Sequence, residues 1–492
     1  MGYWRQGTNA GMGQIFSKAQ IDAEIVAQSA QVKQSPYRVK SDNGFGQPHQ
    51  IGDHPLGLSF THGGMMLDLA AGCEQNQKLD VPWNILAVDL PPQVVRETSG
   101  VNIDLYVKSA LNWIFSKSLA LRDDYDVAIV LTYAFGGYSG RRDAQGLLDS
   151  DFQIRLQRGE ISTICVAAGN GYLEDIHANL THKDVNEQTP LQLVVPAASM
   201  SSTFLQVWLD EGAVLQDAKD MPFTLNIGMP NGQTHQLKLN TNSQAELIMN
   251  NRLVARAYFT NDTPCHALPT AAGPARTLGR FVLAISPSAI NDAIPVGRWN
   301  LWVDKCDLEL PAWIERGDSI HGFPNNRKQA RFEHKSHVRW QENGRANVDL
   351  GQNSVIRRTG TLNDAANAED VIVVAAHRDT DGSSRIAHYS SAGDGFLRRI
   401  PDVGTIAEFS DARRNRIAIG TRGTAKKFVN GTSTAAAIAA REIVGIILAA
   451  IAAKKPIPDL KTSLTAMGAG GQIPQREGAG PIQYQNLRFA ER

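Results

Sequence analysis

The sequence predicts an α/β protein whose parallel sheet is flanked by helices and whose chain is interrupted by an all-β insertion. Apolar runs such as 126–133 and 161–168 alternate with helical patterns up to about residue 189, as in a parallel sheet covered on both faces. Short strands separated by turns, with no helix between them, fill residues 190–312, which is typical of a β-sandwich. The α/β pattern then returns with the apolar run 371–376.

Composition excludes several classes of protein. Lys plus Arg and Asp plus Glu both number 49 in 492 residues, so the formal net charge is zero. This argues against a nucleic-acid-binding protein or a binder of anionic membranes. The longest apolar run, 443–453, is too short to span a bilayer. Residues 1–20 lack a basic start followed by an apolar run, so we expect no signal peptide and a cytoplasmic protein.

The elements before residue 189 can be taken in order. Residues 1–60 contain no convincing strand, but Ser17 and Gln20 have the spacing of a capping box at the start of a helix over 17–28. His62 follows a loop rich in Gly, Pro and His and opens a small apolar helix. We then expect, in order, a strand at 84–90, a helix at 103–119, a strand at 126–133, a weaker helix at 144–158 and a strand at 161–168.

These patterns divide the chain into four stretches. Residues 1–189 and 351–492 are expected to form the two parts of the α/β domain, and 190–312 an inserted β-sandwich of the jelly-roll kind. Residues 313–350 are polar and basic. They are interpreted as a solvated connection, with a patch for an acidic partner as the alternative.

Ser433 lies in the turn Gly431-Thr432-Ser433, immediately before a helix that is small and apolar on every side. Such a helix must be buried, so its first turn carries a hydroxyl into the fold at the positive end of a helix dipole. Two interpretations are open. Ser433 could cap the helix, or it could be a nucleophile whose own N–H helps to hold an oxyanion.

Two further groups share this setting. His62 stands at the start of a buried helix, although a lone histidine is usually structural, and Asn170 follows the buried strand 161–168. Helix N-termini and strand C-termini meet at one edge of a parallel sheet, so we expect these groups to lie near Ser433. A hydroxyl, a base and an amide donor are the groups that acyl transfer requires.

The motifs around these residues resemble those of the subtilisin-like serine peptidases, the subtilases. The resemblance implies a subtilisin-like peptidase domain in which Ser433 is the nucleophile, His62 the base and Asn170 the oxyanion-hole amide. Thr132, Tyr133 and Ala134 would pair with the backbone of a peptide substrate. The matching motifs are Gly431-Thr432-Ser433-Thr434-Ala435-Ala436, Ala168-Gly169-Asn170, His62-Gly63 with Leu69-Ala70-Ala71-Gly72, Ser390-Ser391-Ala392-Gly393 and Pro401-Asp402-Val403. Gly64, Met65 and Ala437 depart from the family pattern.

The family's catalytic aspartate has no clear counterpart. Asp22 lies in the expected first helix, Asp42 and Asp53 lie in polar or Gly/Pro-rich turns, and Asp89 comes after the histidine, where the family has no acid. Either the chain begins after the strand that carried the acid, or the lineage kept the fold and lost catalysis. Removing this aspartate from subtilisin lowers kcat by about 3 × 10⁴. We therefore expect an impaired serine endopeptidase.

Two other functions are considered alternatives. The chain could be an inactive scaffold whose β insertion binds protein or carbohydrate. An unrelated α/β hydrolase is disfavoured, because no Gly-x-Ser-x-Gly surrounds Ser433. No metal-spaced His/Cys cluster or EF-hand loop appears, so we expect no cofactor or metal. The expected partner is a polypeptide substrate, with neither nucleic acid nor membrane. Cleavage specificity and oligomeric state are left open.

Overall fold

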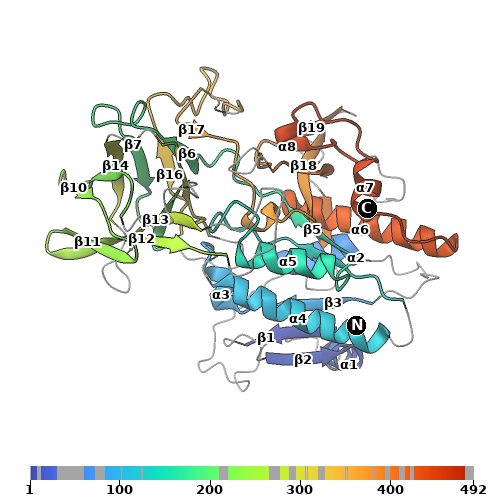
Figure 1. Cartoon of the computed structure of the whole chain (residues 1–492). Coiled ribbons are helices and arrows are strands. Elements are labelled where there is room, and N and C mark those ends of the chain that lie inside the picture. The colour runs from blue at the N-terminus through green and yellow to red at the C-terminus, as the bar shows by residue number, and fades with distance from the viewer. Residues whose placement is uncertain are drawn as a thin grey trace.

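The computed structural model of the chain describes residues 2–7, 13–29, 60–72, 84–100, 102–122, 126–209, 220–264, 277–286, 295–304, 306, 308–319, 327–349, 351, 353–380, 383–393, 399–408, 416–420 and 426–482. A β-rich part and a part with mixed helices and strands lie side by side (Figure 1).

A mostly parallel sheet forms the centre of the mixed part. Its strand order is β19-β18-β5-β4, and β20 pairs with β18 outside this path. Only β19 runs antiparallel to its neighbour. The bounds are β4 (Val130–Tyr133), β5 (Thr163–Ala167), β18 (Ile372–Thr380), β19 (Ser383–Ile386) and β20 (Val403–Glu408). The apolar runs at 126–133, 161–168 and 371–376 thus contain strands, as predicted.

Helices cover both faces of this sheet (Figure 1). Successive side chains of a strand point to opposite faces, so Ile164 and Val166 of β5 share a hydrophobic cluster with α4 (Ile103–Arg122) and α5 (Leu147–Gln157). Cys165 and Ala167 share another with α6 (Thr432–Ala452). The alanines of α6 allow it to lie close to the strands. Among the described helices only α6 is long and apolar enough to cross a membrane by length and composition, but here it packs on β5, β18 and β20.

The first residues differ from the expectation that 1–60 would contain no strand. β1 (Gly2–Gln6) pairs antiparallel with β2 (Gly13–Ser17) and parallel with β3 (Leu86–Asp89). The expectation was wrong because β1 has no apolar run, and of its residues only Trp4 and Gln6 are buried. The predicted capping box is confirmed: the Ser17 N–H donates to Gln20 Oε1 (2.8 Å) and the Gln20 N–H to Ser17 Oγ (3.3 Å). It opens α1 (Lys18–Ser29).

The β-rich part, here called the β region, comprises residues 177–357 and contains two sheets, of orders β10-β9-β14-β7-β16 and β11-β12-β13-β8-β15-β6-β17. One hydrophobic cluster joins them, with Leu193 and Trp299 from the first and Leu205 and Phe259 from the second. The bounds are β6 (His177–Leu180), β7 (Leu191–Val195), β8 (Thr203–Leu209), β9 (Thr224–Gly228), β10 (Thr234–Leu237), β11 (Ser243–Met249), β12 (Arg252–Asp262), β13 (Leu278–Ile285), β14 (Gly297–Asp304), β15 (Leu310–Ile314), β16 (Arg331–Glu333) and β17 (Ile356–Arg357).

The strands of the β region extend beyond 190–312 in both directions. β6 precedes this range, and β16 and β17 follow it. The stretch 313–350 therefore does more than connect, since β16 adds a strand beside β7 and Phe332 is fully buried. The other elements are α2 (His62–Ala71), α3 (Pro92–Arg96), a 3₁₀ helix (Asp364–Asn367), β21 (Arg416–Ile419), β22 (Lys426–Val429), α7 (Leu460–Thr465) and α8 (Pro474–Glu477).

Candidate active site

Ser433 is the second residue of α6, and it does not cap the helix. Gly431 is the N-cap, at φ +113°, a conformation that favours glycine. The Ser433 hydroxyl instead donates a hydrogen bond to the carbonyl oxygen of Ala134, just after β4 (3.0 Å). The cap interpretation is therefore wrong. The side chain is directed at the end of the sheet rather than at its own helix.

Asn170 lies beside the same turn. Its Oδ1 accepts hydrogen bonds from the Thr432 N–H (3.1 Å) and the Thr432 hydroxyl (2.9 Å). Thr432 Oγ1 also accepts the Gly169 N–H (3.1 Å). The structure thus brings Asn170 next to the turn that carries Ser433, although the two lie more than 260 positions apart in the chain.

Two hydrogen-bond donors remain at the turn that carries Ser433, where a Cβ on Gly431 would lie 3.6 Å from Asn170 Nδ2 and 3.9 Å from the Ser433 nitrogen. With Oδ1 of Asn170 held by Thr432, the amide Nδ2 has no hydrogen-bond partner among the described residues, and Asn170 is exposed. The Ser433 N–H, in the first turn of α6, likewise has none there. Helix N-termini leave such N–H groups unsatisfied. An amide and a backbone N–H beside a serine hydroxyl can together stabilise an oxyanion.

His62 is the first residue of α2 and is exposed. Thr61 caps this helix by accepting the Gly64 N–H (3.1 Å). One hydrophobic cluster joins the two helices: it contains Phe60, just before α2, and Met65 in α2, together with Val429, just before α6, and Ala437 in α6. His62 therefore lies at the start of the helix that neighbours the serine helix.

Arg441 of α6 fixes the other end of α2. Its guanidinium donates to the carbonyl oxygens of Leu69 (3.4 Å) and Gly72 (2.8 Å). Leu69 is seven residues after His62, and Arg441 is eight residues after Ser433, which corresponds to about 10 and 12 Å along the two helices. Met65 and Ala437, nearer the starts of the two helices, share the cluster described above. The two helices therefore run in the same direction, with their first turns at the same end.

The segment expected to pair with substrate lies at an edge of the sheet. Thr132 and Tyr133 end β4, whose only strand partner among the described residues is β5. The Tyr133 side chain is buried and packs edge-on against Phe152, with ring centroids 5.6 Å apart. Only the backbone of Tyr133 is therefore available to a substrate. Ala134 follows, with its carbonyl on Ser433.

The structure describes two of the four aspartates named from the sequence, and each has a partner on the first strand or helix of the chain. Asp22 lies on α1 in an ion pair with Lys18. Asp89 ends β3 and accepts a hydrogen bond from the Tyr3 hydroxyl (2.9 Å), and burial raises the pKa of its carboxyl. Asp42 and Asp53 lie outside the described residues.

Sequence reasoning missed two residues that hold the site together. The Tyr389 hydroxyl accepts the Gly431 N–H (2.9 Å), and its carbonyl accepts the Tyr172 N–H (3.3 Å), so it links the serine turn to the loop after Asn170. The Asn363 side-chain amide donates to the carbonyls of Phe135 (2.9 Å) and Ala167 (3.2 Å). Asn363 has no sequence signal, whereas Tyr389 directly precedes the Ser390-Ser391 motif.

Asp364 binds the loop that follows β4. Its Oδ1 accepts the Gly137 N–H (3.3 Å). Burial raises the pKa of this carboxyl, and the charge of Arg142 opposes that shift. The neighbouring Asp104 has its pKa raised to about 7 by burial and by Asp364. No cluster of three potential metal ligands occurs within the described ranges.

Comparison with known proteins supports the fold. No protein-family model and no curated protein matches the chain. The solved structure of the Clostridium perfringens CspB protease superposes with a TM-score of 0.64 over 98% of this chain and 85% of that one, at 16% identity. The chain has the fold of this protease. The prenylagaramide maturation protease PagA aligns over 25% of this chain and 42% of its own, also at 16% identity, with a TM-score of 0.21, which is too low to carry weight.

Proposed function

We propose that the chain is a serine endopeptidase of the subtilase type, with Ser433 as nucleophile, His62 as general base and Asn170 in the oxyanion hole. The observation that carries this proposal is the contact between the Asn170 loop and the serine turn. It leaves Asn170 Nδ2 and the Ser433 N–H available at the turn that carries Ser433. The likeness to the CspB protease fold supports it.

The proposed reaction follows from these groups. Ser433 Oγ attacks the carbonyl carbon of a substrate peptide bond while its proton passes to His62. The carbonyl oxygen becomes an oxyanion, which accepts hydrogen bonds from Asn170 Nδ2 and the Ser433 N–H. The C–N bond breaks as His62 returns the proton to the leaving amine. Water, activated by His62, then hydrolyses the acyl-enzyme. Before attack, the Ser433 hydroxyl must leave the carbonyl of Ala134, because its proton is held there.

The β region is proposed to be a sandwich inserted into this peptidase domain. It separates the Asn170 loop from the serine turn along the sequence, and its own core joins its two sheets. On the sequence alone, the peptidase is also proposed to be slow, because no aspartate before His62 stands in the strand-and-turn motif that carries the family's catalytic acid. Such an aspartate orients the histidine and stabilises the imidazolium.

The test is covalent labelling with a fluorophosphonate probe. The chain should be labelled, and Ser433→Ala should abolish labelling. A matched control is Thr434→Val, which removes the next hydroxyl along α6; Thr434 is buried, and its Oγ1 has no hydrogen-bond partner among the described residues. Labelling should survive in this variant. Absence of labelling in the parent chain, or its persistence in Ser433→Ala, would contradict the proposal.

The alternative function is an inactive protein that keeps the peptidase fold and binds protein or carbohydrate through the β region. The observation that favours it is the engagement of Asp22 and Asp89 with Lys18 and Tyr3. Binding of a partner to the full chain, together with no labelling at Ser433, would support this alternative.

A further inference from the structure

We propose that Arg316, from the β region, occupies the Gly136 end of the sheet edge at which a substrate strand would pair. It thereby limits how many substrate residues before the cleaved bond are recognised. This inference rests on the proposed function, because it concerns the same substrate. It makes Arg316 a specificity-determining residue contributed by the β region.

The carbonyl groups along β4 and just beyond its ends alternate in direction. Ile129 O accepts the Ser162 N–H (3.0 Å), next to β5, and Phe135 O accepts the Asn363 amide, which also binds β5 through Ala167 O. Carbonyls two residues apart along an extended chain point the same way. Those of the odd-numbered residues therefore point toward β5, and those of the even-numbered residues away from it.

Ala134 and Gly136 supply the two carbonyl acceptors on the open side. A peptide added at this edge as an antiparallel strand would donate one N–H to Ala134, from the residue whose carbonyl Ser433 attacks. It would donate a second N–H to Gly136, from the residue two positions earlier. The Ser433 hydroxyl holds the first acceptor (3.0 Å) and would release it during catalysis.

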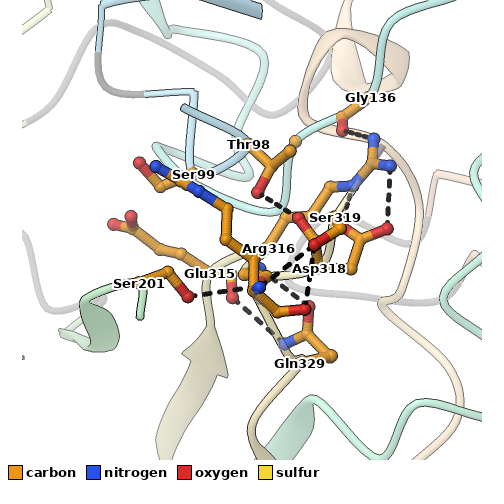
Figure 2. A network of polar contacts seen from close by, with 12 residues as sticks. Thr98, Ser99, Gly136, Ser201, Glu315, Arg316, Asp318, Ser319 and Gln329 are labelled. Carbon is orange, nitrogen blue, oxygen red and sulfur yellow. Dashed lines mark hydrogen bonds and ion pairs between the residues drawn. The ribbon is translucent and has the colours of Figure 1, made fainter. Parts of the chain in front are cut away.

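Arg316 holds the second acceptor. Its Nη1 lies 2.8 Å from Gly136 O, the distance at which the N–H of an added strand would stand. Figure 2 shows the guanidinium between the Gly136 carbonyl and the Asp318 carboxylate. Asp318 pairs with it through both oxygens, at 2.5 and 3.0 Å. Such bidentate pairs fix an arginine in one orientation.

Contacts on both sides hold the arginine segment in place. The Asp318 carbonyl accepts the Thr98 hydroxyl (3.0 Å), which ties the segment to the loop after α3. The Gly317 backbone is held by Ser201 Oγ on its carbonyl (3.2 Å) and by Gln329 Oε1 on its N–H (2.9 Å), both within the β region. Displacing Arg316 would therefore disturb both parts of the protein, so a substrate N–H cannot simply replace it.

The consequence is a short recognition site. The substrate residue whose carbonyl is attacked and the residue before it can bind. The residue before these two finds its backbone acceptor, Gly136 O, already held by Arg316. A backbone hydrogen bond contributes about 1 kcal/mol net, or about fivefold in affinity. Removing the Arg316 side chain should free Gly136 O, so that a third substrate residue strengthens binding about fivefold.

The experiment measures inhibition by acetylated peptide aldehydes of two and of three residues that share the same terminal residues. Each inhibition constant is obtained by competition with fluorophosphonate labelling of the full chain. In the parent, the third residue should change the constant less than about twofold. In Arg316→Ala it should tighten binding about fivefold. The Arg316 guanidinium carbon lies over the Phe135 ring, 6.0 Å from its centroid. Arg316→Met keeps an unbranched side chain at this place and should behave in the same way as Arg316→Ala.

The control is Arg327→Ala, because Arg327 also ties the β region to the loop after α3, through Glu97 (2.9 and 3.2 Å). It should show the parent's length dependence. Each result is a ratio within one preparation, so it does not depend on the folded fraction. A fivefold gain from the third residue in the parent, or no gain in either Arg316 variant, would overturn the inference. Absence of labelling in the parent would instead overturn the proposed function.

Discussion

Thr432→Val tests whether the hydroxyl of Thr432 holds the loop at Gly169 and Asn170 against the turn that carries Ser433. The substitution keeps the shape of the side chain but removes one hydrogen bond to Asn170 Oδ1 and the acceptor of the Gly169 N–H. Thr432 is 1% exposed, so the Gly169 N–H would be left buried without a partner. Such a loss costs about 1–3 kcal/mol in unfolding free energy.

The same change should slow labelling of Ser433. Asn170 would keep only the Thr432 N–H as a donor to its Oδ1, so its Nδ2 would be less well fixed. Complete loss of an oxyanion-hole donor lowers kcat about 10²- to 10³-fold. Thr432→Val acts only indirectly, through Asn170, so its effect on the rate should be smaller. We expect a labelling rate about tenfold lower than in the parent, between those of the parent and Asn170→Ala.

Thr434→Val is the matched comparison. The two threonines lie in the same helical turn and are both buried, but Thr434 Oγ1 has no hydrogen-bond partner in the described part of the chain. Removing it should leave the thermal midpoint and the labelling rate unchanged or slightly improved. Equal effects of the two variants on both measurements would refute the role assigned to Thr432.

Two further predictions concern stability. Burial raises the pKa of Glu315 from 4.5 to about 7, so its ionisation should lower the stability of the folded chain as pH rises from about 4.5 to 7. Glu315→Gln should therefore show a smaller drop in thermal midpoint between pH 5 and pH 8 than the parent. A drop equal to the parent's would count against this effect. The Arg476 guanidinium lies 3.6 Å from the Tyr172 ring centroid and donates to the carbonyls of Ala387 and Ser390. Arg476→Leu removes these contacts and should lower the unfolding free energy by about 3 kcal/mol. A loss below about 1 kcal/mol in chemical denaturation would contradict this prediction.

The parts of the fold that could be predicted carry local signals. β5 and the first five residues of β18 lie in apolar runs, and the reciprocal bonds of Ser17 and Gln20 follow from spacing alone. β1 could not be predicted, because its pairing with β2 and β3 depends on distant residues. β11 shows only a weak alternation of polar and apolar residues, because Ile248 is exposed along with Gln244 and Glu246, and only Leu247 among its residues is buried.

The candidate site shows the same division. Ser433 and Asn170 could be found because a turn at the end of a buried element is visible in sequence. Their contact through Thr432 joins residues more than 260 positions apart, and no pattern predicts which side chain bridges them. The contact of Arg316 with Gly136 spans 180 positions. It depends on how the β region sits against the loop after β4, which spacing cannot reveal.

The most direct measurement of the central claim is a crystal structure of the chain after reaction with a phosphonate probe. The account predicts a phosphorus bonded to Ser433 Oγ, with a phosphonyl oxygen about 2.7–3.1 Å from both Asn170 Nδ2 and the Ser433 nitrogen, and the His62 ring within hydrogen-bond distance of Oγ. An adduct whose oxygen avoids Asn170, or a His62 ring remote from Oγ, would contradict it.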